Sequence, residues 1–234
     1  MQEKQLPRHI GLIMDGNGRW AKKRGMPRYY GHSVGAKTFR NIAQYCSEIG
    51  IEYLTVYAFS TENWRRPEKE VNTILKLMRD YLKDFERYRE LNMKIKFLGD
   101  LSIFDQEMRD MIANLEYESS FATGMNLNIA INYGGRNEIV MASRKIAEEV
   151  ASGALSCDQI DEACLSDHLY TAQMPEVDLV IRPSGEQRLS NFLIWQCAYA
   201  EFVFMDVLWP DFSEKDLDEA LAQYVNRNRR FGGV

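Results

Sequence analysis

The sequence predicts an α/β protein with a central, largely parallel sheet flanked by helices, in a single domain over residues 1–234. Short apolar runs rich in β-branched and aromatic residues alternate along the chain with longer segments of helical periodicity. Such alternation requires crossover connections, which join parallel strands and cover the sheet with helices. No internal repeat, low-complexity tract or linker rich in Pro, Gly and Ser interrupts the chain, so nothing in it marks a domain boundary.

The first half of the chain opens with an apolar run over residues 9–14 that ends in Asp-Gly, which predicts a buried strand followed by a turn. Apolar residues at helical spacing then lead to Gly50, a residue suited to a helix C-cap. The same two patterns predict the next elements: a helix over 33–49, a strand over 53–59, a helix over 71–85, a strand over 93–98, a helix over 104–118 and a strand over 127–132.

The second half continues the alternation, with helices from Gly134 to about Val150, over 158–169 and from Ser213 onward, and strands over 177–181 and 202–205. Its most apolar stretch, residues 192–209, contains Gln196, Glu201 and Asp206. Polar residues at that density argue against a membrane span and favour a buried helix followed by a strand. We therefore expect a soluble protein.

Composition is ordinary for a globular protein, with 45% hydrophobic and 27% charged residues. The four cysteines form no CxxC pair and have no histidine at metal-ligand spacing, which favours reduced thiols in a cytoplasmic protein. The net charge is −5, so an anionic ligand must be attracted by a local basic cluster. One such cluster contains no acidic residue and consists of Arg19, Lys22, Lys23, Arg24 and Arg28.

Ligands of open parallel sheets bind beyond the carboxyl ends of the strands, so the loops that follow the predicted strands are the candidate sites. The first loop reads Asp15-Gly16-Asn17-Gly18-Arg19-Trp20. Its glycines allow close approach of a phosphate, its arginine can bind one through two hydrogen bonds, and its carboxylate suits Mg²⁺. Asn-Gly is also a hairpin signal, and these residue types alone leave a diphosphate site and a hairpin turn both open.

Two further loops carry arginine pairs after predicted strands. One runs from Ser60 to Pro67, and a helix N-cap cluster would explain part of it. The other runs from Arg182 to Asn191 and suits a second phosphate group. Glu201 follows within the apolar stretch, where a carboxylate needs either an arginine or a metal as its partner.

With these loops in place, the chain resembles the cis-prenyltransferases of the undecaprenyl diphosphate synthase type along essentially its whole length. Several long motifs match in the right order: HIGLIMDGNGRWA at 9–21, GH at 31–32, YAFSTENWRRP at 57–67, NYGGR at 132–136, IRPSGEQRLSNF at 181–192 and WPDF at 209–212.

The resemblance implies the cis-prenyltransferase fold, a homodimer, Mg²⁺ as cofactor, and farnesyl and isopentenyl diphosphates as substrates. It implies metal binding by Asp15 and Glu201, and a catalytic role for Asp15 and for Asn63. Because a neutral amide is a poor base, we expect Asn63 to position substrate rather than remove a proton. The product implied is a long-chain polyprenyl diphosphate such as undecaprenyl diphosphate, a carrier precursor for cell-wall polysaccharide that is delivered to the membrane. The implied location is the cytoplasm, or the inner face of the membrane.

The matching motifs also assign substrate binding. The first group, for the allylic diphosphate, is Gly16, Asn17, Gly18, Arg19, Trp20, Arg28 and His32. The loop after the second predicted strand contributes Ser60, Thr61, Glu62, Trp64 and Arg66. The group for isopentenyl diphosphate is Arg182, Arg188, Leu189 and Ser190. Met125 matches the far end of the product tunnel.

This chain departs from the family at Pro183, where threonine is common, and at Gln187, where some relatives have histidine. Proline removes a backbone donor and restricts Arg182 to extended geometry, which suits a strand end.

Three other functions compete with a prenyltransferase. A non-catalytic binding subunit of this family tends to lose the Asp-Gly-Asn-Gly-Arg loop, which is intact here. The sequence contains no recognised nucleic-acid-binding module, which argues against nucleic-acid binding. It also contains no nucleotide-binding motif, which argues against phosphoryl transfer.

Overall fold

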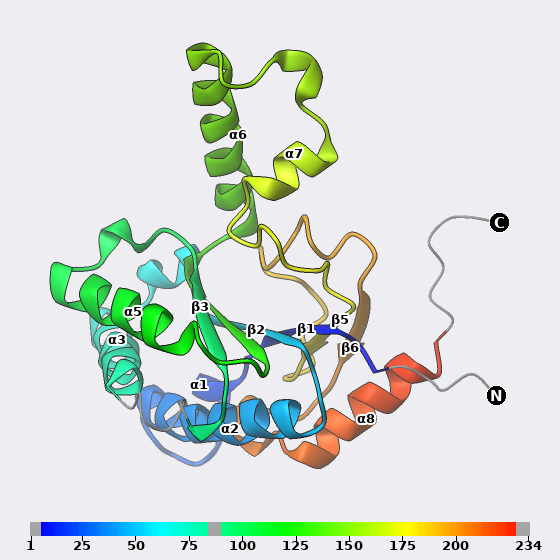
Figure 1. Ribbon diagram of the computed structural model, residues 1–234. Coiled ribbons are helices and arrows are strands. Elements are labelled where there is room, and N and C mark those ends of the chain that lie inside the picture. Colours follow the sequence, from blue (N-terminus) through cyan, green and yellow to red (C-terminus); the bar gives the residue numbers. More distant parts are fainter. Residues whose placement is uncertain (1–5, 84–89, 228–234) are drawn as a thin grey trace.

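A computed structural model describes residues 6–83 and 90–227. Within them, one sheet has the strand order β3-β4-β2-β1-β5-β6, with every pair parallel (Figure 1). The strands are β1 (His9–Ile13), β2 (Tyr53–Ser60), β3 (Lys94–Leu98), β4 (Asn126–Tyr133), β5 (Leu179–Arg182) and β6 (Glu201–Phe204). The parallel sheet predicted from the alternation of apolar runs is confirmed.

The predicted helices are present with shifted ends, except the one expected after residue 192. The main helices are α1 (Asn17–Lys23), α2 (Arg28–Glu48), α3 (Glu68–Leu82), α5 (Gln106–Ser119), α6 (Gly135–Ser152), α7 (Glu162–Asp167) and α8 (Glu214–Val225). Short 3-10 helices are η1 (Thr61–Arg65), η2 (Leu101–Ile103), η3 (Cys157–Gln159) and η4 (Trp209–Asp211). The expected end of the third helix, at residue 85, lies outside the described residues. No helix in the described ranges has both the length and the apolar character that a membrane crossing needs.

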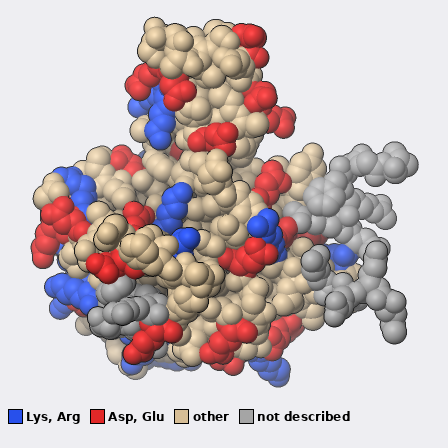
Figure 2. Space-filling view, in the orientation of Figure 1, with Lys and Arg blue, Asp and Glu red and all other residues tan. Residues whose placement is uncertain are grey.

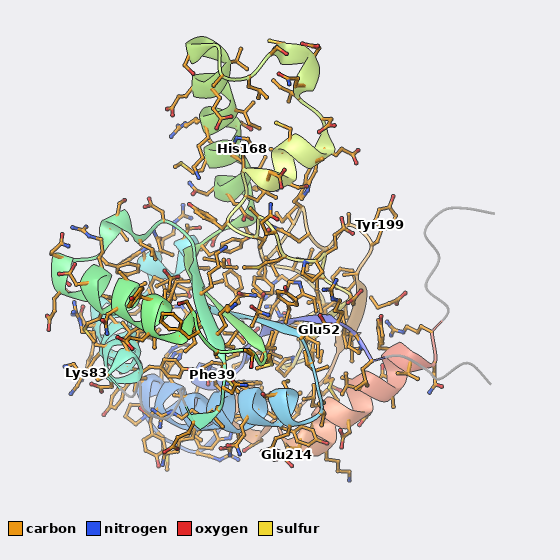
Figure 3. All side chains as sticks on the ribbon, in the orientation of Figure 1. Phe39, Glu52, Lys83, His168, Tyr199 and Glu214 are labelled. Atoms are coloured by element: carbon orange, nitrogen blue, oxygen red, sulfur yellow. The ribbon has the colours of Figure 1, made fainter. Side chains whose placement is uncertain are left out.

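The two faces of the sheet are covered differently. Helices α2, α3, α5 and α8 pack on one face, where their apolar side chains join those of the strands in the largest core cluster (Figure 1). Phe39 points from α2 toward this face (Figure 3). The opposite face is covered by turns within residues 168–200, with Phe192 and Leu193 fully buried against it. The expected sheet flanked by helices is confirmed, and most of its helices pack on one face.

The helix expected within the apolar stretch after residue 192 is wrong, because only turns precede β6 there. Ser190, Asn191 and Leu193 have φ values of 51°, 67° and 42°. This left-handed conformation cannot continue a right-handed helix. The apolar side chains that suggested a helix are buried by a chain that bends repeatedly over the sheet. The strand expected to follow them is confirmed as β6.

Helices α6 and α7 project from the body of the molecule (Figure 1). The base of α6 is fixed by Glu138, a buried carboxylate that accepts hydrogen bonds from the Tyr133 hydroxyl at 2.5 Å, the Gln196 amide at 3.0 Å and the Tyr170 backbone at 2.9 Å. Burial raises the pKa of Glu138 even though these donors lower it. The network ties the projecting helices to the turns that cover the sheet.

Helix α1 lies directly against α2 because two glycines of α2 leave room for it. A Cβ atom at Gly31 would lie 2.0 Å from the Asn17 carbonyl oxygen, and one at Gly35 would lie 2.1 Å from Asn17 Oδ1. Both distances are far shorter than a carbon–oxygen contact allows. The Gly31-His32 motif therefore sets where the first loop sits relative to α2.

Candidate active site

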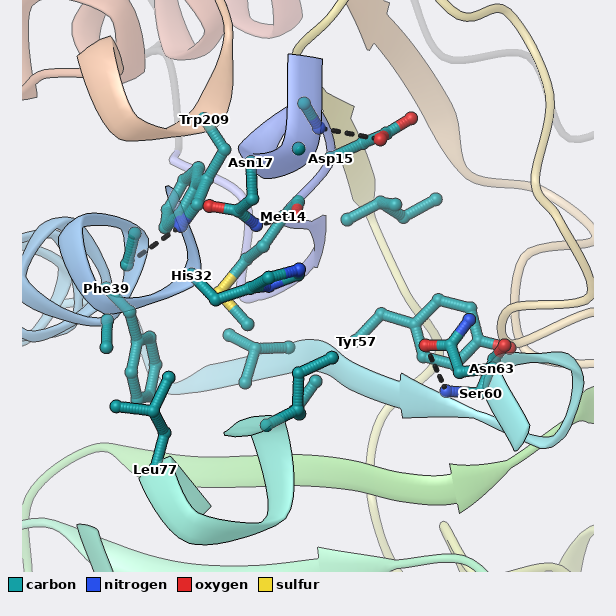
Figure 4. Close-up of a pocket in the computed structure, with 18 of the residues that line it drawn as sticks. Met14, Asp15, Asn17, His32, Phe39, Tyr57, Ser60, Asn63, Leu77 and Trp209 are labelled. Carbon is teal, nitrogen blue, oxygen red and sulfur yellow. Dashed lines mark hydrogen bonds between the residues drawn. The ribbon is translucent and has the colours of Figure 1, made fainter. Parts of the chain in front are cut away.

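A cavity of about 680 Å³ opens at the carboxyl end of the sheet and extends between α2, α3 and the helix-covered face. Charged and polar side chains from the three predicted loops line its mouth, whereas apolar side chains of α2, α3 and the strands line its depth. Phe39 and Leu77 lie together in the apolar part, away from Asp15 and Asn63 (Figure 4). The cavity thus joins a site for anions to a wall suited to hydrocarbon.

Asp15 lies at the mouth, immediately after β1. Its Oδ1 accepts the Gly16 N–H at 2.6 Å, and its Oδ2 accepts Arg182 Nη2 at 2.9 Å and Arg19 Nη2 at 3.4 Å. Partial burial acts to raise the pKa of Asp15, but the hydrogen bond and charge of Arg182, with the charge of Arg19, hold it below its ordinary value. Asp15 is therefore a carboxylate facing the cavity.

The first loop turns sharply into α1, so the hairpin alternative is excluded. Gly16 has φ 105°, and a Cβ there would also lie 3.2 Å from the Leu208 backbone. Gly18 lies under Arg28, whose Cζ would be 2.8 Å from a Cβ at that position. The two glycines allow the chain to turn and let a guanidinium reach the cavity.

Three of the predicted binding residues meet on one carboxylate. Glu70 accepts Arg28 Nε at 2.9 Å, Arg66 Nη1 at 3.1 Å and a contact from His32 Nε2 at 3.2 Å. Its side chain is only 6% exposed. The hydrogen bond of His32 is the largest influence on the carboxyl. With the hydrogen bond and charge of Arg28 and the charge of Arg66, it outweighs burial, which acts to raise the pKa, and the pKa of Glu70 is lowered to about 2. Glu70 holds the cations of the cavity wall in position.

The second loop forms η1, which is closed by a capping box between Ser60 and Asn63, whose Oδ1 accepts the Ser60 N–H at 3.2 Å. Both residues, and Glu62, line the cavity. Glu62 accepts the Asn191 amide at 3.0 Å, which joins the second loop to the third. The N-cap interpretation of this loop is thus confirmed for η1, whereas substrate binding by the loop stays a prediction.

The third loop is held by Arg182, the last residue of β5, whose side chain is 4% exposed. Its Nη1 donates to the Arg188 carbonyl and, at 2.8 Å, to Ser190 Oγ. Arg188 is more exposed and pairs with Glu186, which also contacts Arg19 at 3.2 Å. The predicted effect of Pro183 is confirmed, because Arg182 is extended strand.

Two buried polar atoms at this site have no hydrogen-bond partner in the described part of the chain: Asn17 Oδ1 and Arg182 Nε. Leaving a buried polar group unpaired costs about 1–3 kcal/mol. Both residues line the cavity, but Asn17 Oδ1 packs against Gly35 of α2, so Arg182 Nε is the atom that favours a polar ligand at the mouth.

The structure brings most of the predicted residues together and leaves several out. Among the cavity-lining residues are Asp15, Gly16, Asn17, Gly18, Arg19, Arg28, His32, Ser60, Glu62, Asn63, Arg66, Arg182, Arg188 and Ser190. The lining does not include Trp20, Thr61, Trp64, Leu189, Met125 or Glu201, as far as the structure describes the chain.

The residues left out of the lining have other contacts. Trp20 is buried and donates to Asp211 at 2.6 Å, and Trp64 donates to Asn132 at 2.8 Å while its ring packs on Phe59. Met125 lies in the core just before β4. The loop positions of the tryptophans gave no sign that their rings turn inward.

Glu201 pairs with Arg227 at 3.0 Å, which is the arginine alternative left open by the sequence. In the sheet register, Glu201 of β6 lies beside Leu179 of β5, and Leu179 lies beside Ile10 of β1. Asp15 follows Ile10 by five residues, roughly 16 Å along a strand. One chain therefore cannot place both carboxylates on one ion, and a metal role for Glu201 stays a prediction.

Sequence reasoning missed Glu70 and Asn191. Asn191 lines the cavity, and its Oδ1 also accepts the Arg136 N–H at 2.9 Å. For Glu70 a signal existed, since Arg66 lies four residues before it and such pairs meet on a helix or at its start. Asn191 depends on a left-handed backbone that the sequence does not indicate.

The donors of the site fit Mg²⁺ only together with a ligand. No group of three or more His, Cys, Asp and Glu side chains is arranged to hold a metal in residues 6–83 and 90–227. Mg²⁺ is commonly bound through one or two carboxylates and the oxygens of a substrate phosphate. The ionised carboxylate of Asp15, beside arginines that attract diphosphate, meets that requirement.

Known proteins resemble this chain over nearly its full length. The family described as "Putative undecaprenyl diphosphate synthase" matches residues 13–232. An isoprenyl transferase of Clostridium perfringens is 50% identical over 99% of this chain and 92% of its own. The ditrans,polycis-undecaprenyl-diphosphate synthase of Micrococcus luteus, described as farnesyl-diphosphate specific, is 48% identical over 98% of this chain and 93% of its own.

The fold has a close counterpart among solved structures. Lavandulyl diphosphate synthase from Lavandula x intermedia, in complex with dimethylallyl diphosphate, superposes with a TM-score of 0.94 at 40% identity, covering 97% of this chain and 99% of that one. The arrangement of the three loops around one cavity and the full-length matches lead to the same conclusion: the chain belongs to the undecaprenyl diphosphate synthase family of prenyltransferases.

Proposed function

We propose that this protein condenses farnesyl diphosphate with successive isopentenyl diphosphate units in cis configuration, in a Mg²⁺-dependent reaction. The observation that carries the proposal is the single cavity whose mouth holds Asp15 among arginines and whose depth is apolar. Diphosphates fit the mouth, and a growing hydrocarbon fits the depth. Residues 1–234 would act as one domain.

In the reaction, the double bond of isopentenyl diphosphate attacks C1 of the allylic substrate, the C1–O bond breaks to release pyrophosphate, and a proton leaves the new chain. Arg19, Arg28 and His32 line the side of the cavity beside Asp15 and would accept the charge that develops on the leaving diphosphate. Arg182, Arg188 and Ser190 line the neighbouring side and would hold the diphosphate of the attacking substrate.

Asp15 is the residue that would hold Mg²⁺ with the diphosphates, and the ion when bound would neutralise charge on the leaving group. Asn63 has its Oδ1 committed to the Ser60 backbone, which supports a positioning role. Arg182 keeps Asp15 ionised, and Glu70 keeps Arg28, Arg66 and His32 directed at the cavity.

The apolar depth supports the growth of a long product. Each CH₂ moved from water into an apolar wall gains about 0.8 kcal/mol, so an elongating chain stays bound while the wall lasts. We propose a product of the undecaprenyl class that serves as a lipid-carrier precursor for cell-wall polysaccharide and passes to the membrane from a cytoplasmic enzyme.

The first test is incubation of the purified protein with farnesyl diphosphate, radiolabelled isopentenyl diphosphate and Mg²⁺, followed by chromatography of the dephosphorylated products. A ladder of products longer than the primer is expected. Chelation of Mg²⁺ should remove it and added Mg²⁺ should restore it. A protein that binds farnesyl diphosphate without elongating it would instead be a binding subunit.

The second test is Asp15→Ala, for which we expect turnover to fall by about 100- to 1000-fold or more, as for loss of a group that stabilises transition-state charge. Binding of farnesyl diphosphate and the fold should be largely kept, because Arg182 retains Ser190 and a backbone carbonyl as partners. Asp110→Ala, which removes an exposed carboxylate from α5, is the control. Near-normal turnover in Asp15→Ala would contradict the metal role.

The homodimer is proposed from the family alone, and sedimentation of the purified protein tests it. A monomer at micromolar concentration with full activity would contradict it.

A further inference from the structure

One surface of the molecule takes no part in the reaction described above except through Arg28. Every residue from Lys22 to Tyr30 is exposed, a run that contains Lys22, Lys23, Arg24 and Arg28 but no acidic residue. The same run exposes three large apolar side chains: Met26 at 40%, Tyr29 at 38% and Tyr30 at 43%. Basic and apolar side chains therefore share one surface, which we call the 22–30 surface.

Packing beneath it makes this surface continuous. The segment joins the end of α1 to the start of α2, and both sides of the turn meet on the buried Trp20 ring. Arg24 lies over that ring at 4.1 Å, and Tyr30 stacks on it at 6.3 Å. The Tyr29 ring extends the surface to α3, because Lys69 Nζ lies 5.7 Å from its centroid.

The charge of the 22–30 surface is only partly compensated. Asp211 pairs with Arg24 at 3.1 Å, Arg28 pairs with the buried Glu70, and Glu68 is exposed next to Lys69. Within the described chain, no ion pair is formed by four exposed lysines that lie on or beside this surface: Lys22, Lys23, Lys37 and Lys69. By contrast, acidic and basic side chains are interspersed over the face shown in Figure 2.

Exposed lysines beside tyrosine and methionine suit the boundary of an anionic bilayer. The aromatic rings enter the headgroup region, the methionine reaches the acyl boundary, and the lysines pair with lipid phosphate. A nucleic acid would also be attracted by the lysines but has no use for Met26.

The position of this surface agrees with such a role. Arg28 belongs to the segment and also lines the cavity, and Gly18, one turn before Lys22 on α1, lines it as well. A membrane bound here would lie beside the mouth through which an apolar product leaves.

We propose that the 22–30 surface docks the protein on an anionic lipid bilayer. The inference rests on the proposed function, because a polyprenyl product is what would make this position useful, although docking itself needs no substrate.

The test measures binding to vesicles of phosphatidylglycerol mixed with phosphatidylcholine, by flotation of the full-length protein without substrate. Lys22→Ser with Lys23→Ser should weaken partitioning by about fivefold per lysine, or roughly 25-fold for the pair. Met26→Ser with Tyr29→Ser should also weaken it, since the apolar contact is lost. Vesicles of phosphatidylcholine alone should bind much less of the wild-type protein.

Two matched controls remove the same chemistry elsewhere. Arg144→Ser with Lys145→Ser removes two exposed cations from α6, and Tyr117→Ser with Phe121→Ser removes two exposed aromatics at the end of α5. Both should bind vesicles as the wild type does. Melting curves and turnover in detergent should be unchanged in all four variants, so failure of docking and failure of the enzyme activity are read separately.

Three outcomes would overturn the proposal: no vesicle binding by the wild type, equal losses in the control variants, or dependence on the lysines alone with equal affinity for single-stranded DNA. The last result would identify general attraction of polyanions.

Discussion

The two faces of the sheet both carry polar groups, but they use them differently. On the face covered by turns, His9, Thr55 and Asn128 form a buried ladder: His9 Nε2 lies 2.8 Å from Thr55 Oγ1, which accepts the Asn128 amide at 3.0 Å. On the face covered by helices, Asp15 and the arginines line a cavity, and Glu70 pairs with Arg28 and Arg66 of its wall. The three ladder side chains bond to one another and leave Asn128 Oδ1 unpaired but enclosed within the described chain, whereas Arg182, whose Nε is unpaired there, lines an open cavity.

This contrast teaches how a polar side chain in a strand or at its end can be assigned a role. His9 Nδ1 contacts the Pro175 carbonyl at 2.8 Å, so that nitrogen carries the proton and Nε2 accepts from Thr55. Burial lowers the pKa of His9 and keeps the ring neutral. A neutral, fully enclosed chain of hydrogen bonds specifies strand register, whereas charged groups around an open cavity bind ligands.

The largest effect is expected from Thr55→Val, which breaks the ladder at its centre. His9 Nε2 and the Asn128 amide would both stay buried without this partner, at about 1–3 kcal/mol each. The free energy of unfolding should therefore fall by about 2–6 kcal/mol, with turnover per folded molecule unchanged. Urea unfolding measures the loss, and Thr123→Val, at an exposed threonine, is the control. A large loss of turnover in folded Thr55→Val would mean that the two faces are not separate in function.

Arg188→Ala tests the cavity side of the comparison. Arg188 is exposed, so its loss should cost little stability but remove charge-assisted hydrogen bonds to isopentenyl diphosphate, worth about 1.5–3 kcal/mol. We expect KM for isopentenyl diphosphate to rise roughly 10- to 100-fold, with a smaller change for farnesyl diphosphate. Arg109→Ala, far along the chain on α5, is the matched arginine control. An effect confined to farnesyl diphosphate would reverse the assignment of the two diphosphate sites.

Glu70→Gln tests whether a carboxylate of the cavity also stabilises the fold. The pKa of Glu70 is lowered in the folded state from 4.5 to about 2, so its ionised form contributes stability above about pH 4.5 that is lost as the pH falls toward 2. The wild type should exceed Glu70→Gln by about 1–2 kcal/mol at neutral pH, after screening by water in the cavity, and by little near pH 2.

Unfolding by urea across that pH range measures the difference. Glu68→Gln, two residues earlier and exposed, should show no such trend. A wild-type advantage that does not depend on pH would mean that the Glu70 charge is not what holds the arginines.

The smallest expected effect concerns Met125, which matches the far end of the tunnel in the family but lies outside the cavity lining described here. Leu77 does line the cavity, so Leu77→Trp should shorten the main product while the first condensation keeps near-normal speed. Met125→Trp should mainly lower stability by overpacking the core, by about 1–3 kcal/mol. Thin-layer separation of dephosphorylated products, run beside melting curves, distinguishes them. Stronger shortening by Met125→Trp would show that the product passes beyond the described cavity.

Much of this could be predicted from the chain alone. Apolar runs of four to seven residues placed every strand of the described sheet, because a strand buried in a parallel sheet must be apolar nearly throughout. Loops after those strands identified Asp15, Arg182 and most of the cavity mouth, because parallel strands bring their carboxyl ends to one edge. The resemblance to a known family supplied the substrates.

The tertiary structure decided the rest. Periodicity could not show that Phe192 and Leu193 are buried by turns, because burial requires apolar side chains and not a helix. It could not show which side of η1 Trp64 occupies, nor that Glu70 pairs with Arg28 and His32 of α2 and with Arg66 at the end of η1. The sequence by itself determined which residues are apolar, charged or free to turn. The direction of each side chain was set by packing between segments far apart in the chain. Such distances are fixed by three-dimensional contacts, which no local pattern encodes.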